Sequence, residues 1–187
     1  MKELKIFKDF DFSDFWDNSD YSIKNYVEDY PTDDSIIHIE KELGFKFPNS
    51  YIEFMRYQNG GTPRYNFESL KGTIEISEFL GIGKTKEYSL CGEFGNKFRI
   101  EKWGYPDTGI YICTCPSVGH DMIMLDYSDL NTNNEPKVVH IDQELGYIKK
   151  VIADDFESFI RQFLPEDYYN DFYDWSDEDT DGFDICF

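Results

Sequence analysis

Residues 33–61 read DDSIIHIEKELGFKFPNSYIEFMRYQNGG, and this stretch decides the fold. Its first part places short polar residues, 33–35, directly before the apolar positions of 36–43. Asp and Ser are preferred at helix N-caps, and Gly44 supplies the residue type at which many helices stop. The first part of the stretch therefore predicts a helix that ends at Gly44.

The second part predicts another helix, over residues 49–58. Pro48 suits its first turn, where a missing backbone N–H costs nothing. One face of this helix carries side chains at spacings of three and four, namely Tyr51, Phe54, Met55 and Gln58. Asn59-Gly60-Gly61 ends it, because these residues tolerate a positive φ.

Downstream of this stretch the apolar period changes to two, the period of half-buried strands. The predicted strands are 73–77, 109–115, 121–127 and 138–141. Pro-Ser-Val-Gly at 116–119 is a short turn between two of them, which predicts an antiparallel hairpin. Residues 84–104 are rich in Gly and aromatic residues and are predicted to be irregular.

A last amphipathic helix precedes Pro165. Its apolar stripe has helical spacing and consists of Phe156, Phe159, Ile160, Phe163 and Leu164. Helices, then strands, then a helix is a segregated order, which favours an α+β fold over an alternating parallel one. We therefore predict one α+β domain with a mixed, largely antiparallel sheet flanked by helices.

The composition of the 187 residues is that of a globular and strongly acidic protein, with 40% hydrophobic residues and a formal net charge of −20. This charge disfavours direct binding to nucleic acid or to an anionic membrane, since both would be repelled. Residues 165–187 alone hold nine acidic residues and no basic one. Basic proteins, cations and neutral ligands remain as partners.

The four cysteines are read as reduced thiols of a cytoplasmic protein; they are Cys91, Cys113, Cys115 and Cys186. The first ten residues are charged and aromatic, unlike the apolar region of a secretory signal. No apolar stretch approaches the roughly 20 residues of a membrane span.

Two sets of residues suggest chemistry, and both are interpreted as structural. Cys113, Cys115 and His120 offer three metal ligands, but zinc requires a fourth that the spacing does not supply. His120, His140 and Asp126 form a conceivable catalytic group, while His38 suits a solvated pair with Glu42. We therefore predict no catalytic residue, no cofactor and no metal.

The C-terminal segment contains one calcium-like pattern. Asp177, Asp179, Asp181 and Gly182 match positions 1, 3, 5 and 6 of an EF-hand loop. The bidentate Glu of position 12 would fall at residue 188, beyond Phe187. These three aspartates are therefore only a weak candidate for calcium binding.

Residues 37–61 carry the pattern Ile37-x-x-Glu40-x-x-Leu43-Gly44-x-x-Phe47-Pro48-x-x-Tyr51-x-x-Phe54, followed by Asn59-Gly60-Gly61. This pattern resembles the signature of the SUKH superfamily, the Smi/Knr group of cell-wall synthesis regulators and bacterial immunity proteins. The resemblance covers residues 15–164, a SUKH-like domain. It leaves residues 1–14 as an N-terminal extension and 165–187 as an acidic aromatic tail.

The resemblance implies an α+β fold and no enzymatic activity. Bacterial members neutralise protein toxins of polymorphic or contact-dependent systems, so we expect an immunity protein that binds such a toxin. Two alternatives stay open: a regulatory scaffold with several partners, and an enzyme that uses His120, His140 or Cys113. The family carries no universal catalytic residues to transfer.

Candidate partner contacts are aromatic residues in loop-like segments: Tyr65, Trp103 and Tyr105. Aromatic side chains supply much of the binding energy of interfaces. The alternative for Trp103 is a place in the core. The acidic balance favours a basic partner, such as a nuclease toxin that must hold phosphates.

Overall fold

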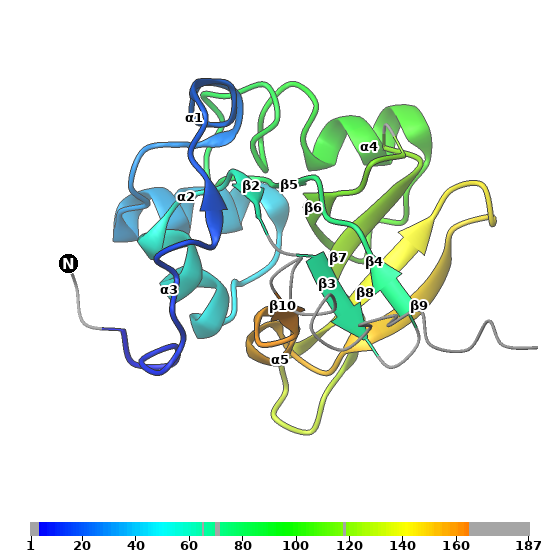
Figure 1. Ribbon diagram of the computed structural model, residues 1–187. Helices are drawn as coiled ribbons and strands as arrows, with labels where there is room; N and C mark the ends of the chain where they lie inside the picture. Colours follow the sequence, from blue (N-terminus) through cyan, green and yellow to red (C-terminus); the bar gives the residue numbers. More distant parts are fainter. Residues whose placement is uncertain (1–3, 65, 70–71, 118, 165–187) are drawn as a thin grey trace, which may run out of the picture.

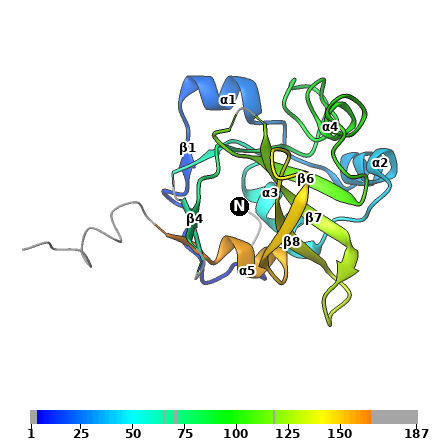
Figure 2. The ribbon, with the colours of Figure 1, turned by 90° about the vertical axis from the view of Figure 1, so that its right-hand side faces the viewer.

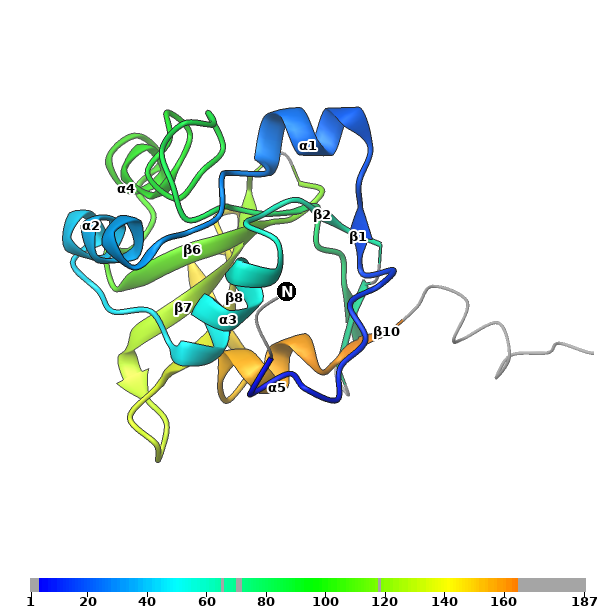
Figure 3. The ribbon, with the colours of Figure 1, turned by 90° about the vertical axis from the view of Figure 1, so that its left-hand side faces the viewer.

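The computed structural model describes residues 4–64, 66–69, 72–117 and 119–164. This part of the chain holds five helices: α1 (Asp20–Tyr26), α2 (Asp33–Leu43), α3 (Asn49–Tyr57), α4 (Asn96–Trp103) and α5 (Phe156–Ile160). Helices α1 and α4 lie at one end of the molecule, and α5 lies at the other end (Figures 1 and 3).

The largest sheet has five strands in the order β5-β6-β7-β8-β9, and each neighbouring pair is antiparallel. Its strands are β5 (Glu78–Phe79), β6 (Gly109–Thr114), β7 (Asp121–Leu130), β8 (Pro136–Asp142) and β9 (Ile148–Ala153). The hairpin predicted around the turn at 116–119 is confirmed as β6–β7. The tip of the next hairpin, β7–β8, extends away from the domain (Figure 2).

Two smaller sheets complete the architecture. One pairs β1 (Trp16–Asp17) with β2 (Thr62–Pro63), and the other has the order β10-β3-β4. The strands of the second are β10 (Phe163–Leu164), β3 (Asn66–Ser69) and β4 (Gly72–Ile74). The predicted α+β domain with a largely antiparallel sheet is confirmed.

Helices α2 and α3 form where the sequence predicts them. The N-cap of α2 is Thr32, one residue before the predicted group, and its hydroxyl accepts a hydrogen bond from the Ser35 N–H at 3.2 Å. Gly44 ends the helix with φ of 81°, the left-handed conformation that glycine adopts freely. Buried Glu40 then accepts the Phe47 N–H at 2.9 Å, which fixes the turn into α3.

Aromatic side chains dominate the core. Phe54 of α3 is fully buried, and its ring centroid lies 5.0 Å from that of Phe79 and 5.4 Å from that of Phe156. These residues join α3, β5 and α5. Burial of each such ring removes a large apolar area from water and is worth about 2–3 kcal/mol.

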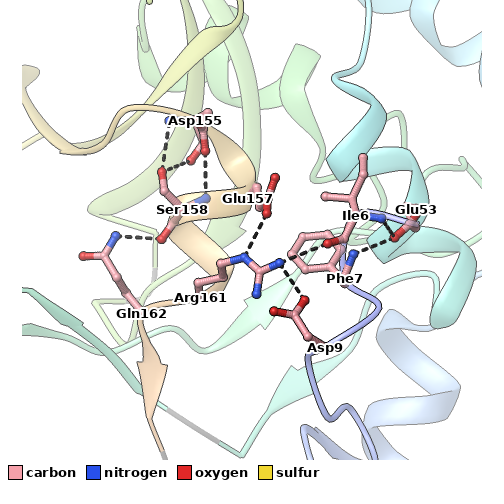
Figure 4. Close-up of polar contacts among 9 residues, drawn as sticks. All are labelled: Ile6, Phe7, Asp9, Glu53, Asp155, Glu157, Ser158, Arg161 and Gln162. Atoms are coloured by element: carbon pink, nitrogen blue, oxygen red, sulfur yellow. Dashed lines mark hydrogen bonds and ion pairs between the residues drawn. The ribbon is translucent and has the colours of Figure 1, made fainter. Parts of the chain in front are cut away.

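The N-terminal segment packs against this core, and both Phe7 and Phe12 are buried in it. Glu53 of α3 accepts the backbone N–H groups of Ile6 at 2.8 Å and Phe7 at 2.9 Å (Figure 4). Arg161, just after α5, donates to the Ile6 carbonyl at 3.0 Å and to Asp9 at 3.1 Å (Figure 4). Residues near both ends of the domain therefore meet.

The predicted last helix is longer than the helix observed, α5. A capping box between Asp155 and Ser158 starts α5, but the helix ends at Ile160. Phe163 instead lies in β10, where it pairs with Phe67 of β3 and buries its ring against Phe159. The apolar spacing of residues 156–164 is therefore also compatible with a short helix followed by a strand.

Three further regions differ from expectation. The predicted strand 73–77 is only partly formed: residues 73–74 belong to β4, residues 75–77 lie outside any strand, and β5 begins at Glu78. Residues 84–104, predicted to be irregular, contain α4. Strand β9 lies at the edge of the large sheet and was not expected.

Candidate functional site

One buried carboxylate holds a long irregular segment, residues 80–95, in place. Glu28 is 6% exposed and accepts the backbone N–H groups of Thr85 at 2.6 Å and Lys86 at 3.0 Å. The hydroxyls of Thr85 and Ser89 also donate to it. Burial alone would raise the pKa of Glu28, but the hydrogen bonds from Ser89 and Thr85 outweigh burial and lower it.

Asn96 fastens the start of α4 to the large sheet. Its side-chain N–H₂ donates to the carbonyls of Leu90 and Tyr111, both at 3.1 Å. Its side-chain oxygen accepts the Tyr111 N–H at 2.7 Å. Because the amide is buried and fully used, α4 has a fixed position relative to β6.

Five aromatic rings follow one another between α1 and the end of α4, and we call them the ring arc: Tyr26, Tyr88, Phe94, Phe98 and Trp103. Successive ring centroids are 5.3 Å apart for the first three pairs and 5.4 Å apart for Phe98 and Trp103. These are normal separations for interacting rings. The ring arc is therefore a continuous apolar wall.

A cavity of about 430 Å³ lies against this wall. Its other lining residues come from α4, β5, the end of β6 and the β6–β7 turn, and include Arg99, Glu78, Thr114, Cys115 and Gly119. This volume lies within the range of about 300–1,000 Å³ typical of small-molecule sites. Mostly apolar walls with a few polar groups are also typical of such sites.

Arg99 of α4 is the buried cation of the cavity, with 4% exposure. Its guanidinium carbon lies 5.6 Å from the Trp103 ring centroid. No described residue forms an ion pair or a hydrogen bond with its side chain, and its Nε is buried without a partner. Burial lowers the pKa of this guanidinium, and the nearby Tyr105, Tyr88 and Glu78 partly offset this lowering.

Gly119 allows the turn to approach this cation closely. Its φ is 93°, and an added Cβ would lie 2.5 Å from the Trp103 ring and 3.0 Å from an Arg99 terminal nitrogen. Any larger residue would have to displace one of them. The glycine therefore sets the shape of the cavity at the β6–β7 turn.

A second cluster lies at the same end of the sheet, where Cys115, Asp121 and His140 place one ligand atom each within 4.8 Å of one another. His140 Nε2 is 2.6 Å from Asp121 Oδ2, and Ser117 also bonds to this carboxylate. Burial, followed by the charge of Asp121, raises the pKa of the Cys115 thiol, so it is protonated at neutral pH. The donor types suit zinc, but the geometry is that of a hydrogen-bonded group joining β6, β7 and β8.

The predicted partner contacts have different environments. Trp103 is half-buried at the end of α4, and its carbonyl accepts a hydrogen bond from the Tyr147 hydroxyl. Tyr105 is 2% exposed, and its hydroxyl donates to the Gly119 carbonyl at 2.7 Å. Tyr65 lies outside the described residues, as do Asp177, Asp179 and Asp181.

The residues considered for catalysis are dispersed. His120 is exposed, with Nδ1 3.7 Å from Glu144, while Cys113 is buried in β6. Asp126 does not join the histidines, because Lys149 Nζ lies 2.9 Å from both of its carboxylate oxygens. The grouping of His120, His140 and Asp126 is therefore not formed.

Sequence reasoning missed Arg99 and Asp121. Arg99 is one of several basic residues in a polar segment, and nothing in the spacing shows that it is buried. Asp121 follows the predicted turn at 116–119, so the hairpin register places it near Cys115. The register of the predicted hairpin was therefore the feature of the sequence that could have revealed the second cluster.

A family model described as the SMI1 / KNR4 family (SUKH-1) matches residues 30–162. The chain is an α+β protein with one buried aromatic core, and it belongs to the SMI1/KNR4 (SUKH-1) family. A comparison with curated proteins finds none that matches this chain. In the described part of the chain, no helix has the length and apolarity required to cross a membrane.

Proposed function

We propose that this protein is a non-enzymatic, cytoplasmic immunity protein that binds and neutralises a cognate protein toxin. Membership of the SMI1/KNR4 (SUKH-1) family carries the proposal, because a protein-binding role is associated with this family. The dispersed histidines and protonated Cys115 also give no support to an enzyme. A regulatory scaffold that binds several partners is the alternative from the same family.

Electrostatics favours a basic partner. The formal net charge is −20, and a nuclease toxin would present a basic surface for phosphates. Opposite potentials mainly raise the rate of association, while rim charges add little to affinity. We therefore expect an association rate that falls steeply when the ionic strength passes about 0.1 M, where the screening length is about 10 Å.

The acidic tail contributes to this attraction. Deletion of residues 176–187 removes five acidic residues: Asp177, Glu178, Asp179, Asp181 and Asp184. The truncated protein should associate more slowly while dissociating at a nearly unchanged rate. An association rate indifferent to both salt and truncation would assign the acidity to solubility instead.

The candidate contact surface lies at the β8–β9 end of the large sheet. Leu145 in the turn is 63% exposed and Ile148 on the edge strand β9 is 64% exposed. Tyr147, between them, packs its ring 5.1 Å from Tyr105 and reaches the Trp103 carbonyl. Exposed apolar side chains beside a half-buried tryptophan form a suitable anchor for a partner.

Affinity capture with the full chain as bait, from cells that encode it, tests the proposed function. We expect one basic protein, toxic when expressed alone and tolerated when this chain is expressed with it. Several unrelated partners, none of them toxic, would favour the scaffold and contradict the proposal.

The contact surface is tested with matched substitutions. Ile148→Ala should weaken the captured complex by about tenfold, in keeping with an interface anchor. Ile37→Ala on α2 is the control, since Ile37 is 57% exposed on a different element. Equal affinities of both variants would remove the support for this surface.

A further inference from the structure

We propose that the cavity between the ring arc and the β6–β7 turn binds a small monocarboxylate with an aromatic or apolar body, whose carboxylate pairs with Arg99. This small-molecule site differs from the proposed toxin-binding surface on β9, although Trp103 lines the cavity and also lies beside that surface. It adds a ligand to a protein for which only a protein partner is otherwise expected.

The charge of Arg99 indicates an anion. The residue is 4% exposed, and its side chain lacks any hydrogen-bonding or ionic partner in the described residues. A buried charge without a partner is strongly unfavourable, whereas a paired one is tolerated. The planar guanidinium matches a carboxylate through two parallel N–H···O bonds, so a carboxylate supplies the missing partner.

The walls of the cavity indicate the body of the ligand. Phe98, Trp103 and Tyr88 of the ring arc line the cavity opposite the strand ends. Aromatic walls favour flat apolar groups through burial and offset stacking. At about 430 Å³ the cavity is larger than one amino-acid side chain, which favours a free small molecule over a residue inserted by a partner.

Glu78 limits the charge of the ligand to a single negative unit. Its carboxylate lines the same cavity and bonds to the Thr114 hydroxyl, so it stays on the wall. A phosphate monoester carries close to two negative charges at neutral pH and would be repelled by it. One carboxylate, directed to Arg99 and away from Glu78, fits both groups.

The cavity is built before the ligand arrives. Glu28 fixes the segment that carries Tyr88, and Asn96 fixes the start of α4. The close approach of Gly119 sets the position of the opposite wall. Binding therefore needs little reorganisation of the protein, which favours affinity for small ligands.

Calorimetric titration of the full chain with three acids tests the proposal: benzoate, phenylacetate and indole-3-acetate. Each acid is compared with its neutral amide, and phenyl phosphate is the doubly charged probe. We expect at least one acid to bind at least tenfold tighter than its amide and than phenyl phosphate. The proposal is overturned if no acid binds better than its amide.

Two variants locate the site. Arg99→Met should weaken binding of the acid at least tenfold, while Lys97→Met should leave it unchanged. Lys97 is the matched control, since its side chain is 81% exposed on the same helix. Thermal unfolding establishes that both variants fold, and unchanged acid binding by a folded Arg99→Met variant contradicts the proposal.

The proposed function is tested separately by the captured toxin. If Arg99→Met abolishes toxin binding and no acid binds, the occupant of the cavity is an acidic side chain of the partner and the small-acid proposal fails. If no toxin is captured but the acids bind through Arg99, the cavity proposal stands while the proposed function fails.

Discussion

Two buried charges lie close to the same irregular segment, and their environments are opposite. Glu28 is 6% exposed and receives hydrogen bonds from two backbone N–H groups and two hydroxyls. Arg99 is 4% exposed and has no partner of this kind among the described residues. Equal burial therefore does not imply an equal role.

Ionised Glu28 stabilises the fold, because its charge-assisted hydrogen bonds outweigh the loss of its hydration, as its lowered pKa indicates. Arg99 lines a cavity, and the Trp103 ring 5.6 Å from its guanidinium carbon compensates only part of its desolvation. A residue of the first kind is a structural element. A residue of the second kind suits a ligand site, because a bound carboxylate can supply the hydrogen bonds that the guanidinium does not make within the protein.

Glu28→Gln is the largest perturbation on the structural side of this comparison. The amide has one acceptor oxygen instead of two and directs an N–H₂ group at existing donors. We expect the free energy of unfolding in urea to fall by about 3 kcal/mol. Glu101→Gln, on the exposed side of α4, is the control and should change it by less than about 0.5 kcal/mol.

Lys149→Met examines a charge pair of intermediate burial. Lys149 Nζ lies 2.9 Å from both oxygens of buried Asp126 and 2.8 Å from the Thr108 hydroxyl. Removal of the ammonium leaves Asp126 with Ser128 as its remaining partner, so we expect a loss of about 2 kcal/mol in the same assay. Lys150→Met changes its exposed neighbour on β9, and an equal loss there would refute a specific role of the pair.

The pH dependence of stability provides a second test of the role of Glu28. Burial acts to raise the pKa of Glu28, but its hydrogen bonds hold it below the ordinary value of 4.5. A lowered pKa in the folded state gives stability that is present above 4.5 and is lost as the pH falls through the folded value. The stability difference between wild type and Glu28→Gln should therefore narrow between urea titrations at pH 7 and pH 3.

Arg99→Met should have the smallest effect on stability, and its sign is opposite. Methionine keeps the apolar stem and removes the unpaired charge, so unfolding should be unchanged or up to about 1 kcal/mol more costly. Urea unfolding at pH 7 without added carboxylate measures this. A loss as large as that of Glu28→Gln would place Arg99 among the structural charges.

The sequence predicts those elements whose apolar spacing and end residues agree. For α2 and α3, the spacing of Ile36, Ile39, Phe54 and Met55 coincides with Gly44 and Asn59 at the ends. The structure differs in one cap, Thr32, because a threonine hydroxyl at that position reaches the Ser35 N–H. Local chemistry was sufficient in this region.

Elements defined by their surroundings were not predictable. Strand β9 contains Lys149 and Lys150 side by side, which interrupts the alternation of a half-buried strand. Helix α4 buries polar Asn96 and charged Arg99, so it lacks an apolar stripe. The ring arc joins residues from Tyr26 to Trp103, and no short-range pattern brings them together.

The hydrogen bonds between Arg161 and the N-terminal segment affect how the protein folds during its synthesis. Arg161 bonds to Ile6 and Asp9, partners more than 150 positions earlier in the chain. On the ribosome, Phe7 and Phe12 emerge long before α5, and the closure of so long a loop is slow. The contacts of these rings with Phe54 of α3 can form earlier, but those of Arg161 with Ile6 and Asp9 cannot. The N-terminal segment is therefore incompletely held, and open to chaperones, until α5 has left the exit tunnel.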